Sequence, residues 1–135
     1  MEAEILISTI TKIVNDYGKQ SKSSTVNQLL DWKDLLVGYN YHLAELMSDY
    51  FAQYTKNYYI RKIKIAREKN RLIKEGSAIS AAESIATVEA AQEFQKELEY
   101  ESMANRLDNL LRQSNKVAEA MTQRIAVLRN ERNES

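Results

Sequence analysis

The ten residues KEGSAISAAE, at positions 74–83, decide the fold of this chain because they contain its clearest turn. Gly76 suits the left-handed residue that closes a helix, and Ser80 with Glu83 matches the capping box that begins another. We therefore place the turn at 76–79. A connection this short forces sequential helices to pack antiparallel. The stretch predicts an all-α protein built around a long antiparallel helical hairpin, coiled-coil-like, over residues 25–135.

Little on either side of the turn would interrupt a helix, since the 135 residues include no proline and only three glycines. The first hairpin helix is expected to begin at Thr25, which forms a capping-box pair with Gln28, and to continue to residue 75. Its apolar stripe keeps heptad spacing at Leu29, Trp32, Leu36, Tyr39, Leu43, Leu46 and Tyr50, then resumes in a shifted frame at Tyr59, Ile63, Ala66, Asn70 and Ile73. The second helix is expected over residues 81–130, with three-four spacing from Tyr100 to Met121.

Residues 1–17 form a separate, short amphipathic helix in this interpretation, and the small polar residues 18–24 form a linker. Two hairpin helices bury only one face each, so a further layer must cover the rest. Two interpretations of the N-terminal helix stay open. Either it packs on its own hairpin as a third helix, or it docks on a neighbouring subunit or on another protein. We expect a homo-oligomer, with Ile5, Leu6, Ile10 and Ile13 as its candidate contact residues.

The charges predict the register of the hairpin. Residues 56–76 contain eight Lys or Arg against two Asp or Glu, although the whole chain has a net charge of zero. A turn at 76–79 places residues opposite each other when their numbers add up to about 155. The basic segment 56–74 then faces the glutamates of 83–99. The same register sets Tyr59, Ile63 and Ile73 opposite the alanines of 78–91, so large side chains face small ones.

Several classes of protein fit the composition poorly. The chain has no cysteine for disulfides or thiolate metal sites, no basic N-terminal leader, and no apolar run of the ~20 residues that a spanning helix needs. We expect a soluble cytoplasmic protein without membrane contact, in the host cytoplasm if the protein is viral. His42 is the only histidine, and we find no nucleophile–base pair or phosphate loop. Neither catalysis nor a metal or other cofactor is expected.

The basic segment and the tyrosines before it form the candidate binding surface: Tyr41, Tyr54, Tyr58, Arg61, Lys62 and Lys69. Basic residues among aromatics are typical of surfaces that contact phosphates and stack bases. The alternative is that the basic side chains pair with the opposing glutamates and the tyrosines line the seam. We favour the second interpretation because the acidic partners lie where the turn predicts.

The chain resembles small coiled-coil proteins of bacteriophages. The likeness covers residues 25–131 in general pattern: a tryptophan near the start, a basic middle, the turn KEGSAISAAE at 74–83 and the ending MTQRIAVLRNE at 121–131. Such proteins associate with replication or recombination proteins, form parts of the virion, or inhibit host defences. The resemblance implies a binding role and carries over no site residue.

We therefore expect a non-enzymatic helical protein that acts as an accessory, structural or inhibitory factor by binding a macromolecular partner. The partner that we favour is another protein. Two alternatives stay open. The first is a single-stranded nucleic-acid-binding accessory protein that uses residues 54–74. The second is a binder of a small ligand such as a nucleotide, held at a subunit interface between basic and aromatic side chains.

Overall fold

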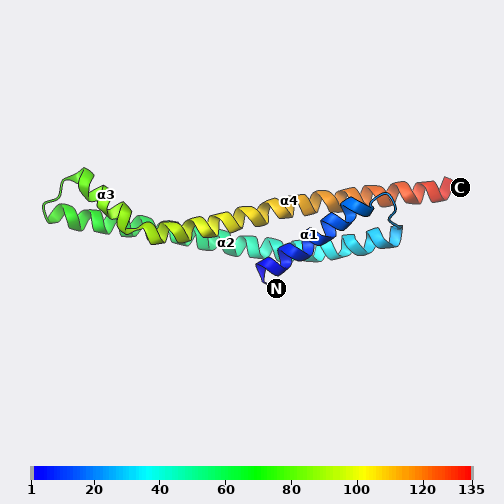
Figure 1. Ribbon diagram of the computed structural model, residues 1–135, viewed down its shortest axis with the longest axis horizontal. Helices are drawn as coiled ribbons and strands as arrows, with labels where there is room; N and C mark the ends of the chain where they lie inside the picture. The colour runs from blue at the N-terminus through cyan, green and yellow to red at the C-terminus, as the bar shows by residue number, and fades with distance from the viewer. Residues whose placement is uncertain (1, 135) are drawn as a thin grey trace. The chain divides into compact units, whose positions relative to one another are not determined.

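The computed structural model describes residues 2–134, which form four α-helices and no strand. These are α1 (Ala3–Gln20), α2 (Val26–Lys74), α3 (Ile79–Glu89) and α4 (Ala91–Glu134), and α2 packs antiparallel against α4 (Figure 1). The predicted all-α class and helical hairpin are thus confirmed. Contacts divide the chain into two compact units: unit 1, Met1–Met47 with Asn105–Ser135, and unit 2, Ser48–Ala104.

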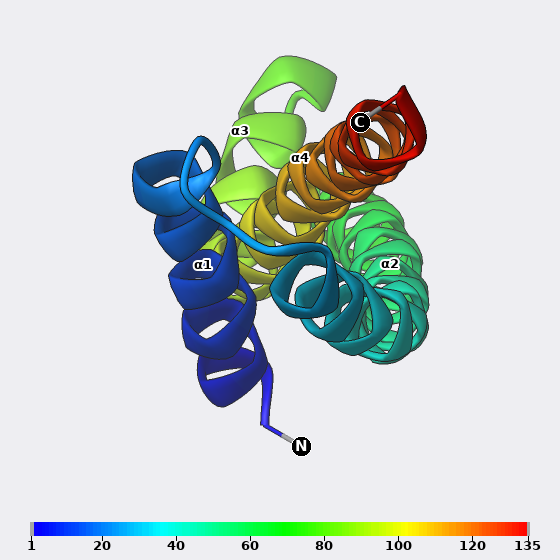
Figure 2. The same cartoon turned by 90° about the vertical axis from the view of Figure 1, so that its right-hand side faces the viewer.

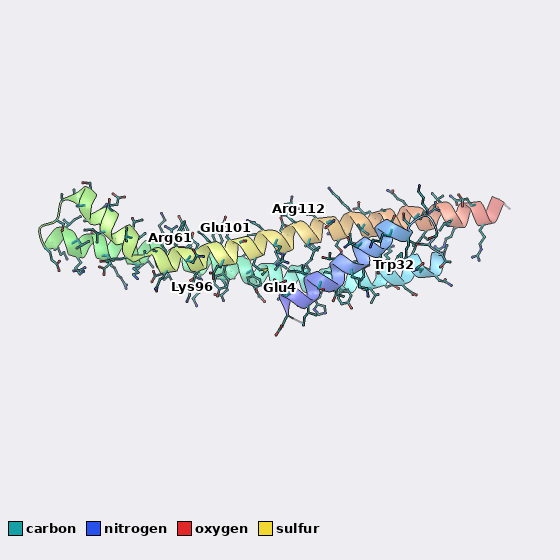
Figure 3. All side chains as sticks on the ribbon, viewed as in Figure 1. Glu4, Trp32, Arg61, Lys96, Glu101 and Arg112 are labelled. Carbon is teal, nitrogen blue, oxygen red and sulfur yellow. The ribbon has the colours of Figure 1, made fainter. Side chains whose placement is uncertain are left out.

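Unit 1 is a three-helix assembly in which α1 lies beside α2 and α4 (Figure 2). Its largest fully buried side chains are Leu6, Ile10, Leu29, Leu36, Leu43, Leu107 and Met121. Trp32 of α2 meets the ring of Tyr17 edge to face at 6.4 Å, and Arg106 of α4 donates to Glu4 of α1 at 2.7 Å (Figure 3 labels Glu4 and Trp32). The N-terminal helix therefore packs within its own chain.

This packing corrects the surface assigned to oligomerisation. Leu6 and Ile10 are fully buried and Ile13 nearly so, because all three face the interior of unit 1. Only Ile5 is exposed. The apolar side of α1 that the sequence offered to a neighbouring subunit is covered by the chain itself.

A polar layer crosses unit 1 in the first third of α2, at Asn40. The fully buried Ser114 donates its hydroxyl proton to Asn40 Oδ1 at 2.6 Å, and Asn40 Nδ2 donates to Asn115 Oδ1 at 3.0 Å. A buried polar group without a hydrogen bond destabilises the folded state. Because these side chains meet at only one alignment of the two helices, they favour a single register. Asn40 and Asn115 add up to 155, as the turn predicts.

The register holds in unit 2 as well, within one helical turn. Ion pairs join Arg61 to Glu97, Lys64 to Glu93 and Lys69 to Glu83, whose numbers add up to 158, 157 and 152. The predicted pairing of the basic segment with the opposing glutamates is confirmed for these three residues.

The ends of the helices differ in detail from the sequence interpretation. Gly76 has a φ of 102°, and the amides of Gly76 and Ser77 donate to the carbonyls of Ile73 and Leu72 at 3.1 and 3.0 Å. This is the predicted glycine closure, a Schellman motif. The capping box at Ser80 is wrong: α3 begins at Ile79, and Ala78 caps it without a side-chain hydrogen bond.

The helix ends around residues 18–28 also differ from those predicted. Helix α1 runs past Gly18 to Gln20, so Gly18 does not end it. At the start of α2 the Gln28 amide donates to Thr25 Oγ1 at 3.2 Å, but the Gln28 side chain donates to Gln20 instead of returning to Thr25. One half of that capping box forms.

The helix expected over 81–130 is interrupted at Ala90, where ψ is 11°. The Ala90 amide is shared between the carbonyls of Ala86 and Thr87, and its own carbonyl still accepts from Phe94 at 3.0 Å. Hydrogen bonds are therefore retained through the bend, which needs neither proline nor glycine. Ala82, Ala86 and Ala90 are fully buried, as expected for small residues at a close helix contact.

Candidate interaction surface

Four of the five residues in the shifted apolar frame predicted for the second half of α2 are exposed, and only Ile73 is partly buried. Tyr59 and Ile63 are 59% and 51% exposed, and Ala66 and Asn70 are exposed too. Partly buried residues instead follow one another at Tyr50, Tyr54, Asn57, Arg61, Lys64, Glu68 and Leu72, at steps of four, three, four, three, four and four. These steps are closer to the 3.6-residue period of a straight helix than a strict heptad is, and they place charged residues in the seam of unit 2.

The central pair of this seam is Arg61 with Glu97 (Figure 3 labels Arg61). Arg61 Nε donates to Oε2 at 2.5 Å and Nη2 donates to Oε1 at 3.2 Å, with side chains 16% and 5% exposed. The hydrogen bond to Glu97 raises the pKa of Arg61. The guanidinium also lies 4.9 Å from the ring centre of Phe94. Arg61, predicted as a surface contact, therefore lies mostly buried in the seam, where it pairs with Glu97.

A second pair lies one turn along the seam. Lys64 Nζ donates to Glu93 Oε1 at 2.8 Å, and this hydrogen bond holds the pKa of Glu93 below its ordinary value. The other oxygen, Glu93 Oε2, is buried and has no partner among the residues described. The third pair, Lys69 with Glu83 at 3.7 Å, is more open to solvent.

The tyrosines of the candidate surface fall into two environments. Tyr54 and Tyr58 are half-buried beside the seam, and the negative charge of Glu101 is the main cause that raises the pKa of Tyr54. Tyr58 meets the ring of Tyr59 at 5.3 Å, and Lys62 Nζ lies 5.4 Å from the Tyr58 ring centre. Tyr41 is 65% exposed but belongs to unit 1, so it does not share this surface.

The ion pairs use only part of the basic segment. Of its eight Lys and Arg residues, Arg61, Lys64, Lys69 and Arg71 pair with glutamates. Within residues 2–134 no ion-pair partner is found for the other four, which are Lys56, Lys62, Arg67 and Lys74. The segment 56–74 contains one acidic residue, Glu68, and this residue pairs with Arg71.

Four residues of the shifted frame are exposed along one side of α2. We call Tyr59, Ile63, Ala66 and Asn70 the outer stripe of α2. Helical geometry places each of them about 140–180° around the axis from Arg61, away from the seam. Ile60, 43% exposed, lies beside the stripe.

Elsewhere unit 2 also exposes large apolar side chains on α3 and α4: Ile79, Ile85, Val88, Phe94 and Leu98. No group of three or more metal-ligating side chains gathers anywhere in residues 2–134. Nor is any helix in that range both long enough and apolar enough to cross a membrane. Comparison with protein-family models, with curated proteins and with solved structures found no match for this chain.

Proposed function

We propose that this chain is a non-enzymatic helical interaction protein that binds another protein through unit 2, as an accessory, structural or inhibitory factor. The observation that carries the proposal is the arrangement of unit 2, with ion pairs inside its seam and Tyr59, Ile60 and Ile63 exposed on the outer side of α2. Clustered exposed apolar and aromatic residues beside basic ones are typical of protein interfaces.

Nucleic-acid binding is the second candidate, and a specific observation favours it. Lys56, Lys62, Arg67 and Lys74 remain available for phosphate contacts, and Tyr59 is an exposed ring on which a base could stack. Protein binding fits better because Ile60 and Ile63, which take up the centre of this face, contribute neither charge nor a stacking plane.

The test is capture of partners from native host extract with the wild-type chain and two matched variants, followed by mass spectrometry. Tyr59→Ala with Ile63→Ala removes the centre of the outer stripe. Val37→Ala with Tyr41→Ala removes an exposed tyrosine and an exposed β-branched residue at the same four-residue spacing on α2, but in unit 1. Alanine favours helix at all four positions, so folding is retained.

We expect a discrete protein to be captured by the wild type and by the unit 1 variant, and to be lost with the unit 2 variant. Capture that is equal with all three chains, or that disappears only with the unit 1 variant, would refute binding through unit 2. Nuclease treatment that abolishes capture would promote the second candidate.

A further inference from the structure

We infer that the outer stripe of α2 docks an amphipathic helix of another protein, one whose apolar heptad positions are flanked by Asp and Glu. This inference rests on the proposed function and specifies the chemistry of the partner. Three features of the stripe carry it: its spacing, the shape of the surface beside it, and the sign of the charges along its edges.

The spacing is that of a coiled-coil seam. Tyr59, Ile63, Ala66 and Asn70 follow each other at intervals of four, three and four residues. This pattern keeps side chains facing a second helix and is the period at which helices wind around one another. The stripe extends about 16 Å along α2, or about three helical turns. Nothing within unit 2 covers it, since Tyr59 and Ile63 are more than half exposed.

The surface beside the stripe has the shape that receives a side chain from a helix. Ile60, Ile63, Lys64 and Arg67 line an open hollow, together with Glu68. The first four lie at positions i, i+3, i+4 and i+7, the four residues of one helix that form the hole for a knob of the facing helix. All five residues come from α2, and Lys64 and Glu68 also line the seam, so the hollow lies between the outer stripe and the seam.

The charges decide which helix fits. In a coiled coil the residues next to the apolar positions select the partner. Here they are Lys62 and Lys69 on one edge, and Arg67 and Lys74 on the other edge, between the stripe and Ile60. Lys62, Arg67 and Lys74 have no acidic partner among the residues that the structure describes. Carboxylates on the incoming helix would supply those partners.

The same charges disfavour a second copy of the chain. Two outer stripes packed together, parallel or antiparallel, would set lysines and arginines of one copy against those of the other. Like charges at these positions oppose pairing. Asn70 adds a further requirement: a polar residue in a helix seam favours a partner with a polar residue at the facing position.

The test uses labelled helical peptides of about three heptads, read by fluorescence anisotropy with the full chain. The first peptide has leucine at the apolar heptad positions, one central asparagine and glutamate on both flanks. The second peptide has lysine on both flanks. The third peptide keeps the glutamates but replaces the leucines by serine. Like charges on the flanks also keep the first two peptides from pairing with themselves.

We expect binding of the glutamate-flanked leucine peptide alone, with affinity that falls as salt is added. Tyr59→Ala with Ile63→Ala should weaken it by about tenfold or more, as two large side chains lose their burial. Lys62→Glu with Arg67→Glu should reverse the preference toward the lysine-flanked peptide. Lys22→Glu with Lys116→Glu, at exposed positions on other segments, should change nothing.

Equal binding of the first two peptides, or binding of the serine peptide as strong as that of the leucine peptide, would overturn the inference. So would tighter binding of a single-stranded oligonucleotide or of anionic vesicles, if Tyr59→Ala with Ile63→Ala abolished it. Self-association that this variant abolishes would name a second copy as the occupant. If capture from extract depends on the stripe while the acidic peptide fails to bind, the inference falls and the proposed function stands.

Discussion

At the scale of single residues, Arg61 is the position where the chain departs furthest from an ordinary helical seam. An arginine and a glutamate occupy places that leucines fill in unit 1, and both are nearly buried. A buried ion pair contributes little net stability compared with apolar residues of the same size, but an unpaired buried charge is destabilising. The pair therefore sets the register of the helices.

Replacement of one partner should cost far more than replacement of both. We expect Arg61→Ala to lower the free energy of unfolding by about 2–3 kcal/mol, because Glu97 is left without its hydrogen bonds. Arg61→Met with Glu97→Met should restore wild-type stability or exceed it. Urea denaturation followed by circular dichroism measures both. A double variant less stable than Arg61→Ala would mean that the pair itself stabilises unit 2.

Acidification should weaken unit 2 through Glu93 and Glu68. The Lys64 hydrogen bond lowers the pKa of Glu93, and the Arg71 hydrogen bond is the main cause that lowers the pKa of Glu68, each from an ordinary value of 4.5. A folded-state pKa below the unfolded one stabilises the protein above the unfolded value, and that stability is lost as the pH falls through the folded value. The urea midpoint should decline below pH 4.5.

Substitution of Glu93 measures how much of the pH dependence of stability comes from the Glu93 carboxylate. Glu93→Gln should make the decline of the urea midpoint shallower, whereas Glu119→Gln, at an exposed position, should leave the profile as it is in the wild type. Parallel profiles for the wild type and Glu93→Gln would show that the Lys64 pair does not persist in solution.

At the scale of helices, two glycines of the hairpin have opposite roles. Gly76 has a φ of 102°, a conformation that only glycine adopts readily, while Gly38 lies inside α2 with open space around its Cα. We expect Gly76→Ala to destabilise the protein by about 1 kcal/mol and Gly38→Ala to stabilise it by about 0.5–1 kcal/mol. Thermal denaturation should show the two midpoints move in opposite directions. A stabilising Gly76→Ala would mean that the chain does not turn there.

The hairpin was predictable from the sequence because its signals are local. Gly76 marks the end of α2, and the charges on either side of it fix the register to within a turn, as the Arg61–Glu97 and Lys64–Glu93 pairs show. The bend at Ala90 was not predictable, since no glycine or proline marks it and the backbone keeps its hydrogen bonds.

The side of α2 that faces α4 in unit 2 was also assigned wrongly. Apolar spacing locates a stripe but does not say which helix covers it, and Ile63 was taken for a core residue on that basis. The side that faces α4 is decided by contacts between the two helices. Glu93 and Glu97 of α4 pair with Lys64 and Arg61 of α2, and these pairs make a charged seam possible. Of the candidate site, Tyr54, Tyr58, Arg61, Lys62 and Lys69 lie in unit 2 and Tyr41 lies in unit 1. Arg61 faces the seam, where it pairs with Glu97.

At the scale of the whole molecule, the two units differ in how their apolar residues are used. Unit 1 buries most of its leucines and isoleucines between α1, α2 and α4, whereas unit 2 has only two helical layers and leaves Ile85, Val88, Phe94 and Leu98 exposed. We expect the chain to self-associate through this face of α3 and α4, which leaves the outer stripe free. Light scattering should give at least twice the chain mass of 15.6 kDa. A strictly monomeric mass at high concentration would contradict this expectation.

The central claim is that the second apolar stripe of α2 faces outward, and the reactivity of introduced thiols tests it most directly. The chain has no cysteine of its own, so Ala66→Cys on the outer stripe and Ala86→Cys in the seam report on single positions through the same substitution. The thiol at 66 should react with a thiol reagent nearly as fast in the native protein as in the unfolded protein. The thiol at 86 should be strongly protected until the protein unfolds. Protection at 66 equal to that at 86 would show that the stripe is buried, and would contradict the account.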